Sequence, residues 1–177
     1  MSRPINLAAP PPCRIGGLAW IPRFTGEGRE DAVLMVQANY GPCKGSFQLP
    51  GGHAEHLEPD WEAMLRQVKR ETGFVPGVER LLGKDWVPAN TETGAAMGQN
   101  FIYLCKPVPA TAEIRLPAAE PGMEAELGTY CWMTLDEIAE RAQLYQIRRF
   151  RALWTAWQTD TFANLKHGRP LPILHAA

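Results

Sequence analysis

Three polar side chains near the middle of the chain share one face of a predicted helix. Gln67, Arg70 and Glu71 stand at i, i+3 and i+4, a spacing that brings side chains together on an α-helix. Two further carboxylates, Glu55 and Glu58, lie in the segment just before that helix. Mg²⁺ prefers carboxylate and carbonyl oxygens, often alongside substrate phosphates. The pattern therefore predicts a site that holds a divalent ion against a diphosphate.

The same residues also fit an ordinary amphipathic surface helix. Its charges would then be solvated, and Glu62 with Arg66 would form one more i,i+4 ion pair. Spacing alone leaves both interpretations open.

A glycine turn and an amphipathic helix are expected to position these side chains. Gly51 and Gly52 follow a short strand predicted at 46–50, and glycine lets the backbone approach a ligand closely. Pro59 suits the first helical position, and Gly73 suits the C-terminal cap. Four residues at helical spacing predict the buried face of the helix, namely Trp61, Leu65, Val68 and Thr72.

The remaining elements are predicted from apolar periodicity and turn residues. Strands are expected at 14–22, 32–38, 80–89, 100–108 and 129–135, the first two forming a hairpin. Helices are expected at 136–142 and through a helix-rich tail at 146–168. This order predicts an α+β domain with a mixed sheet between helices. We divide the chain into an extended arm at 1–13, a domain at 14–145 and a helical C-terminal extension at 146–177 packed on that domain.

Composition and charge narrow the classes of protein. With 45% hydrophobic and 21% charged residues in 177, the chain resembles an ordinary globular domain. The formal net charge of −1 gives no electrostatic reason to expect nucleic acid or a membrane surface as a partner. No apolar run of about 18 residues is present. The four widely spaced cysteines predict reduced thiols and a cytoplasmic location.

The stretch from Gly52 to Phe74 resembles the Nudix box, the signature of the Nudix hydrolases. That pattern is Gly, five residues, Glu, seven residues, Arg-Glu, an aliphatic residue, any residue, Glu-Glu, any residue, Gly and an aliphatic residue. Gly52, Glu58, Arg66, Glu71 and Gly73 stand at the matching positions without a gap. The preceding "FQLPGG" and the later "CWMTLDEIAER" (131–141) also resemble the family, so the resemblance covers about residues 14 to 142.

This resemblance implies a fold, an activity and roles for residues. It implies the Nudix α/β/α sandwich and hydrolysis of a nucleoside diphosphate linked to another group, with Mg²⁺ or Mn²⁺. It implies a small diphosphate or nucleotide-like substrate and, because Nudix proteins are often dimers, a homodimer. Glu71 matches a metal ligand of the family. Arg66 matches a structural arginine that orients carboxylates, here towards Glu58 or Glu62.

Two positions depart from the family pattern. Gln67 replaces the glutamate after the arginine, and Arg70 replaces the first of the paired glutamates. At about 4 Å and an effective dielectric near 20, a guanidinium repels a unit positive charge by about 4 kcal/mol, and a divalent ion by twice that. We therefore expect fewer ions than usual, with one at Glu71, the Gly51 or Gly52 carbonyl and Glu55. Arg70 is expected to bind phosphate oxygens bidentately, or else to face solvent beside an acid.

A base that activates water is expected outside the box. Some Nudix proteins take it from a loop glutamate, and here Glu120, Glu124 and Glu126 lie in an acidic loop before Trp132. Glu124 is our candidate among the three, although each one fits a solvated loop acid as well.

A different metal site would use the histidines that flank Glu55. His53, His56 and Glu58 offer ligands for Zn²⁺ or Mn²⁺, and the alternative is two histidines that donate hydrogen bonds or lie at the surface.

Three functional hypotheses follow. The first is a Nudix hydrolase with an altered, metal-poor site, in which Glu71, Gln67, Arg70 and Glu124 act on the diphosphate. The second is a Nudix-fold module that binds a nucleotide-like ligand without hydrolysis. The third, a different reaction on a diphosphate substrate, has no specific support in the sequence. The substrate is expected to be set by the loops at 39–45, 88–99 and 117–128.

Overall fold

The computed structural model describes residues 12–24, 31–92, 94–119 and 121–171. Most of the arm predicted at 1–13 therefore lies outside the described residues. In chain order the elements are β1 (Cys13–Trp20), β2 (Arg23–Phe24), β3 (Val33–Ala38), the 3₁₀ helix η1 (Gly41–Cys43), β4 (Phe47–Gln48), β5 (Gly51–His53), α1 (Asp60–Thr72), β6 (Val78–Val87), β7 (Met97–Cys105), β8 (Val108–Pro109), β9 (Leu127–Met133), α2 (Leu135–Arg141), α3 (Leu144–Gln158), β10 (Ala163–Lys166) and β11 (Arg169–Pro170).

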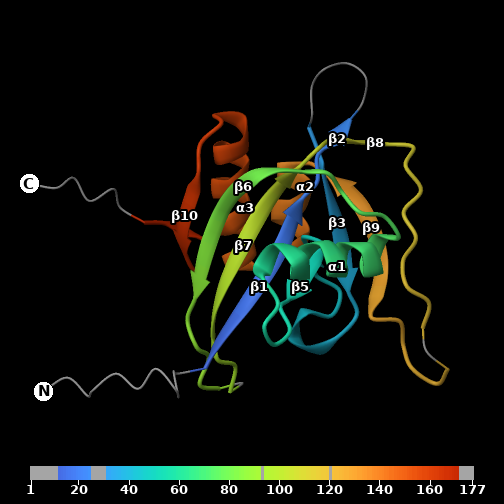
Figure 1. The fold of residues 1–177 in the computed structure, drawn as a ribbon, viewed down its shortest axis with the longest axis horizontal. Coiled ribbons are helices and arrows are strands. Elements are labelled where there is room, and N and C mark those ends of the chain that lie inside the picture. Colours follow the sequence, from blue (N-terminus) through green and yellow to red (C-terminus); the bar gives the residue numbers. More distant parts are fainter. Residues whose placement is uncertain (1–11, 25–30, 93, 120, 172–177) are drawn as a thin grey trace, which may run out of the picture.

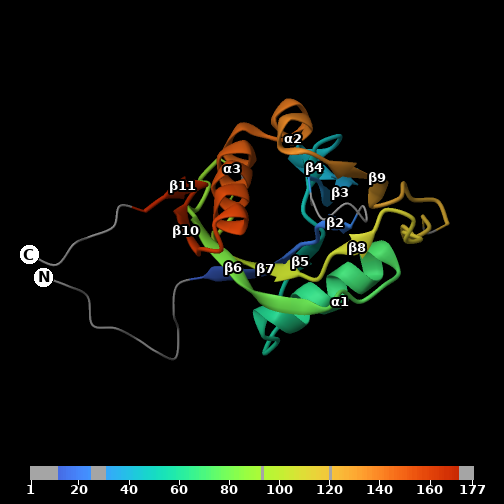
Figure 2. The same ribbon diagram turned by 90° about the horizontal axis from the view of Figure 1, so that it is seen from above.

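A mixed six-stranded sheet in the order β11-β10-β6-β7-β1-β5 forms the centre of the fold. Within it β1 runs parallel to β7 and antiparallel to β5, and β10 runs parallel to β6. Helix α1 covers one face of this sheet, and α3 lies on the opposite face, together with α2 and a second sheet of order β4-β3-β9 (Figure 1 and Figure 2). The predicted α+β sandwich with a mixed central sheet is therefore confirmed.

Two apolar clusters hold these layers together. Consecutive residues of a strand point to opposite faces of the sheet, and β1 shows this clearly. Trp20 packs in the larger cluster with Phe150 and Leu153 of α3. Its neighbour Ala19 packs in the smaller cluster with Met64 of α1. A single strand thus anchors both helical layers.

Helix α1 approaches β1 closely, and this contact sets which face of the helix is buried. A Cβ added at Gly17 would lie 2.0 Å from the carbonyl oxygen of Asp60, so only glycine allows the approach. The buried residues of α1 are Ala63, Met64, Val68, Glu71 and Thr72. Trp61 is 47% exposed. The predicted buried face was therefore wrong at Trp61, because the contact with β1 turns the neighbouring stripe through Met64 inward.

The end of α1 follows the prediction. Gly73 adopts a left-handed φ of 80°, and its N–H donates to the carbonyl of Lys69. This is the C-terminal cap expected of a glycine.

Two other predictions are corrected. Strands β1 and β3 do not form a hairpin within one sheet, since β3 pairs with β4 and β9 and meets the first segment through a single bridge between Pro22 and Val33. The helix-rich tail is helical over α3, but residues 163–166 form β10 of the central sheet. Ala163 and Leu165 are buried while their neighbours are exposed, which is the alternation of a strand. None of the helices in the described segments is both long and apolar enough to span a bilayer.

Candidate active site

A buried carboxylate fastens the glycine turn to helix α1. The backbone N–H of Gly51 donates to Oε2 of Glu71 at 2.8 Å. Glu71 is 3% exposed, and this burial raises its pKa to about 7, against the opposing effects of the Gly51 N–H and Arg70. Gly51 has a φ of 128°, and a Cβ there would lie 2.3 Å from the carbonyl oxygen of Gly17. Glycine is therefore required where the turn meets both β1 and Glu71.

Gln67 touches the next residue of the same turn. A Cβ at Gly52 would lie 3.1 Å from the side chain of Gln67. The Oε1 atom of Gln67 is buried and has no hydrogen-bond partner. The side chain of Gln67 and the carboxylate of Glu71 thus both lie against the turn, and Oε1 of Gln67 is unsatisfied. A buried acceptor without a partner is unfavourable, so this oxygen is suited to an added cation or donor.

Arg66 ties together the loop that precedes the helix. Its Nε and Nη2 donate to Oε1 and Oε2 of Glu58, both at 2.7 Å, and Nη2 also donates to the carbonyl of His53 at 3.2 Å. The arginine and, secondly, the Glu55 N–H lower the pKa of Glu58 to about 2. Oε1 of Glu55 lies 3.5 Å from Nη1 of Arg66. Glu55, predicted as a metal ligand with Glu71, is instead drawn to Arg66.

Arg70 faces an acidic residue that lies 56 residues further along the chain. Its Nη1 and Nη2 contact Oε2 and Oε1 of Glu126 at 3.0 and 3.1 Å, a two-point ion pair. Both groups act electrostatically on Glu71, since Arg70 lowers its pKa and Glu126 raises it. The pair is about half exposed, at 49% for Arg70 and 42% for Glu126. Arg70 therefore lies beside the buried carboxylate of Glu71, and its positive charge is already balanced by Glu126.

The glutamates of the acidic loop lie in two different environments. Glu124, our candidate base, forms an exposed ion pair with Nζ of Lys44 at 2.6 Å, whereas Glu126 lies at the box. Glu120 lies outside the described residues. The sequence offered three loop acids with no signal to separate them, because the difference depends on where β9 begins.

The histidines that flank Glu55 were open to two interpretations, ligands for Zn²⁺ or Mn²⁺ and hydrogen-bonding or surface residues. Nε2 of His53 lies 3.0 Å from Nη1 of Arg14, and burial, followed by this arginine, lowers the pKa of His53. Glu58 is bound by Arg66. Across the segments that the structure describes, no three His, Cys, Asp or Glu side chains gather in a way that would hold a metal. Of the two interpretations, this arrangement favours hydrogen-bonding or surface histidines, because His53 contacts Arg14, Glu58 is bound by Arg66 and His56 is exposed.

A cavity of about 250 Å³ opens beside the glycine turn. It lies between Gly51–Gly52 and helix α3, and its lining includes Tyr145, Gln146 and Arg149. These helix residues were not among the predicted site residues. The sequence could have indicated Arg149, because it occupies the same helical stripe as the buried Leu153 and Ala156, where a charged side chain is unusual.

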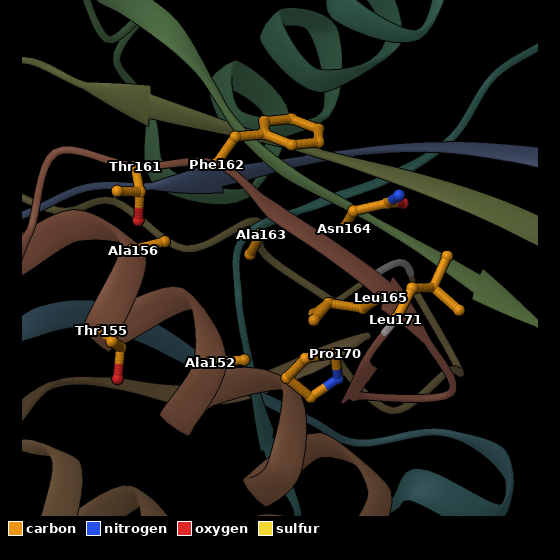
Figure 3. Close-up of a pocket in the computed structure, with 10 residues that line it drawn as sticks. All are labelled: Ala152, Thr155, Ala156, Thr161, Phe162, Ala163, Asn164, Leu165, Pro170 and Leu171. Atoms are coloured by element: carbon orange, nitrogen blue, oxygen red, sulfur yellow. The ribbon is translucent and has the colours of Figure 1, made fainter. Parts of the chain in front are cut away.

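A larger cavity of about 740 Å³ lies between α3 and β10–β11 (Figure 3). The described residues that line it carry no ionisable side chain, and they are Ala152, Thr155, Ala156, Thr161, Phe162, Ala163, Asn164, Leu165, Pro170 and Leu171. It has apolar walls and none of the groups that chemistry on a diphosphate requires.

Comparisons with known proteins agree with this geometry. The family model of the NUDIX domain matches residues 18–158. The chain therefore belongs to the Nudix family. It is 36% identical over 74 residues to an ADP-ribose pyrophosphatase of Methanocaldococcus jannaschii, covering 42% of this chain and 44% of that protein. The chain thus spans less than half the length of this curated relative.

Two further matches cover more of the chain. It is 32% identical over 129 residues to a MutT-like protein of Streptomyces ambofaciens, covering 71% of each chain. A crystal structure of a UDP-X diphosphatase has a TM-score of 0.64 at 19% identity, covering 89% of this chain and 68% of that one. This structural likeness shows a shared fold.

Proposed function

We propose that this chain hydrolyses the diphosphate linkage of a small nucleoside diphosphate derivative. The observation that carries the proposal is the buried carboxylate of Glu71 on the Gly51–Gly52 turn, with the Arg70–Glu126 pair beside it. Membership of the Nudix family, whose members generally use divalent metal ions, supports the reaction class.

The donor set fits one divalent ion and does not fit a cluster of ions. Glu71 supplies a carboxylate at the turn, and Gln67, whose side chain lies against Gly52, has a buried oxygen without a partner. These two residues would hold the ion together with a glycine carbonyl. When bound, such an ion would neutralise negative charge on the diphosphate. Glu55 and Glu58 pair with Arg66 and would not be ligands of this ion.

The protein's own groups would carry the proton and the phosphate contacts. We assign the base to Glu126 in place of Glu124, because only the former stands at the box. Glu126 would take a proton from water as the water oxygen bonds to phosphorus. The bridging P–O bond then breaks, and its electron pair leaves with the departing phosphate. Arg70 would bind the non-bridging oxygens at two points, as a guanidinium does with phosphate.

Turnover of a panel of nucleoside diphosphate derivatives with Mg²⁺ and with Mn²⁺ tests this proposal. Glu126→Gln should lower kcat about 100-fold or more, which is the usual contribution of a general base. Glu71→Gln removes the one carboxylate that would hold the ion and should also lower kcat strongly. Glu124→Gln decides between the two loop acids and should retain activity, and Glu113→Gln is a matched surface control. Full activity in Glu71→Gln would contradict the site assignment.

A second candidate is a binding module that has lost hydrolysis. The observation that favours it is the replacement of two box glutamates by Gln67 and Arg70. In that case Gln67→Glu combined with Arg70→Glu should create cation binding that calorimetry detects and that the natural chain lacks. Rapid turnover by the natural chain would exclude this function.

A further inference from the structure

Arg149 is a buried guanidinium on the wall of the cavity beside the glycine turn. It is 5% exposed, and its Nε donates to Oδ2 of Asp85 at 2.7 Å. Asp85 is itself fully buried, and its other oxygen accepts the N–H of Gly168 at 3.0 Å. The Nη2 of Arg149 has no hydrogen-bond partner. Asp85 therefore fixes the arginine in place while leaving donor capacity unused.

The N–H groups of an arginine can be paired only with hydrogen-bond acceptors. A guanidinium carries five N–H donors and no acceptor. A buried donor that makes no hydrogen bond is unfavourable, so the side chain is suited to a ligand that presents acceptor atoms. The other polar side chains that line the cavity include the amides of Gln48, Asn100 and Gln146, which can donate or accept. Arg14 also lines the cavity, but its Nε donates to the carbonyl of Ala96 and its Nη1 contacts His53. Among the described lining residues, Arg149 is the guanidinium with a buried N–H group that lacks a partner, so it favours acceptors over donors.

The size and the aromatic walls of the cavity suit a ring system. Its volume of about 250 Å³ lies just below the range of about 300–1,000 Å³ that is usual for small-molecule pockets. Tyr145 and Phe150 add aromatic surface, and the Tyr145 ring centre lies 5.4 Å from Cζ of Arg149. The described lining residues include no carboxylate. Gly51 and Gly52 form the opposite wall, and Gly51 also binds Glu71.

We propose that this cavity receives the base of the substrate and that Arg149 selects a base with a carbonyl edge, such as guanine or uracil, over adenine. The inference rests on the proposed function, because it places the base next to the turn where the diphosphate would lie. Guanine offers O6 and N7 as neighbouring acceptors, and arginine binds this edge bidentately. Adenine carries an amino donor at the position of O6, which sets donor against donor.

The test compares compounds that differ only in the base. Binding of GDP, UDP and ADP is measured by calorimetry in the absence of metal, and kcat/KM is measured for GDP-glucose, UDP-glucose and ADP-glucose with Mg²⁺. We expect the guanine or the uracil compounds to be preferred over adenine at least tenfold. Equal or better use of the adenine compounds by the natural chain would overturn the inference.

Variants separate base selection from a structural role of Arg149. Arg149→Met should bring the ratio between bases close to one. Arg149→Lys keeps a cation opposite Asp85 if the methionine variant fails to fold, and it should reduce the ratio because lysine lacks the planar fork. Arg148→Lys is the matched control, since the neighbouring arginine lines a different cavity. An unchanged ratio in folded Arg149→Lys would contradict selection by this residue.

The two measurements also keep this inference apart from the proposed hydrolysis. If GDP or UDP binds at least tenfold more tightly than ADP and no compound is cleaved, base selection stands and the proposed function fails. If all three sugar nucleotides are cleaved equally, the proposed function stands and base selection fails.

Discussion

Replacing Glu71 by glutamine should remove a defined pH dependence of stability. The carboxyl of Glu71 has a pKa of about 7 in the folded chain because it is buried, against an ordinary value of 4.5. The folded state therefore binds the proton more tightly than the unfolded state does. Between these two values the folded state carries more protons, so the free energy of unfolding must fall as pH rises through this window.

The size of the effect follows from the same two values. The two pKa values differ by about 2.5, which at about 1.4 kcal/mol per pKa unit gives a total of about 3.5 kcal/mol. Of this, about 2 kcal/mol develops between about pH 5 and about pH 7.5. Glu71→Gln cannot ionise, yet its amide oxygen can still accept the Gly51 N–H. The variant should therefore gain about 2 kcal/mol relative to the natural chain over that interval.

Urea unfolding at the two pH values, in the presence of a chelator, measures this difference. Glu62→Gln removes an exposed carboxylate from the same helix and serves as the matched control. It should follow the natural chain. Parallel pH profiles for the natural chain and Glu71→Gln would refute the reasoning, because they would mean that the folded chain does not hold this proton.

Two further predictions concern the elements that position the site. Gly17→Ala should destabilise the fold by about 3 kcal/mol or more, because a Cβ there meets the backbone of Asp60 at 2.0 Å and overpacking of this kind cannot relax easily. Thermal unfolding measures it, and Gly98→Ala, with its nearest atoms at 3.4 Å, should change little. Arg66→Met should lower kcat about 10- to 100-fold through misplacement of the glycine turn, since it frees both Glu58 and the His53 carbonyl. Steady-state kinetics at saturating substrate would show it, and an unchanged kcat would mean that the turn keeps its position without the arginine.

The sequence predicted what local spacing controls. The gap-free spacing from Gly52 to Gly73 placed the helix, its cap and the approach of Glu71 to the turn. Helical periodicity gave the wrong burial for Trp61. Two adjacent stripes of α1 are apolar enough to be buried, and the close contact of Gly17 with the helix determines which of them faces the sheet. Periodicity also missed β10, whose four residues follow α3 after a short turn at 159–162 and are identified as a strand by their pairing with β6.

Contacts between residues far apart in the chain could not be predicted from the sequence. Arg70 and Glu126 are 56 residues apart, and Arg149 and Asp85 are 64 apart. Each pair joins two elements whose register is set by the whole sheet. No local pattern specifies that register, so the sequence narrowed the loop acids to three without selecting Glu126.

The pairing of Arg70 with Glu126 changes the electrostatic argument about the departures from the Nudix pattern. The expected repulsion of a cation assumed that the guanidinium stood alone, but a two-point contact with a carboxylate cancels its charge. With Glu71 ionised, the group formed by Gln67, Arg70, Glu71 and Glu126 has a net charge of −1, which attracts one divalent ion and gives little reason for several. A diphosphate that draws Arg70 to its own oxygens would release Glu126 in the same event. Arg70, which replaced a glutamate of the family pattern, would then keep Glu126 paired until the substrate binds.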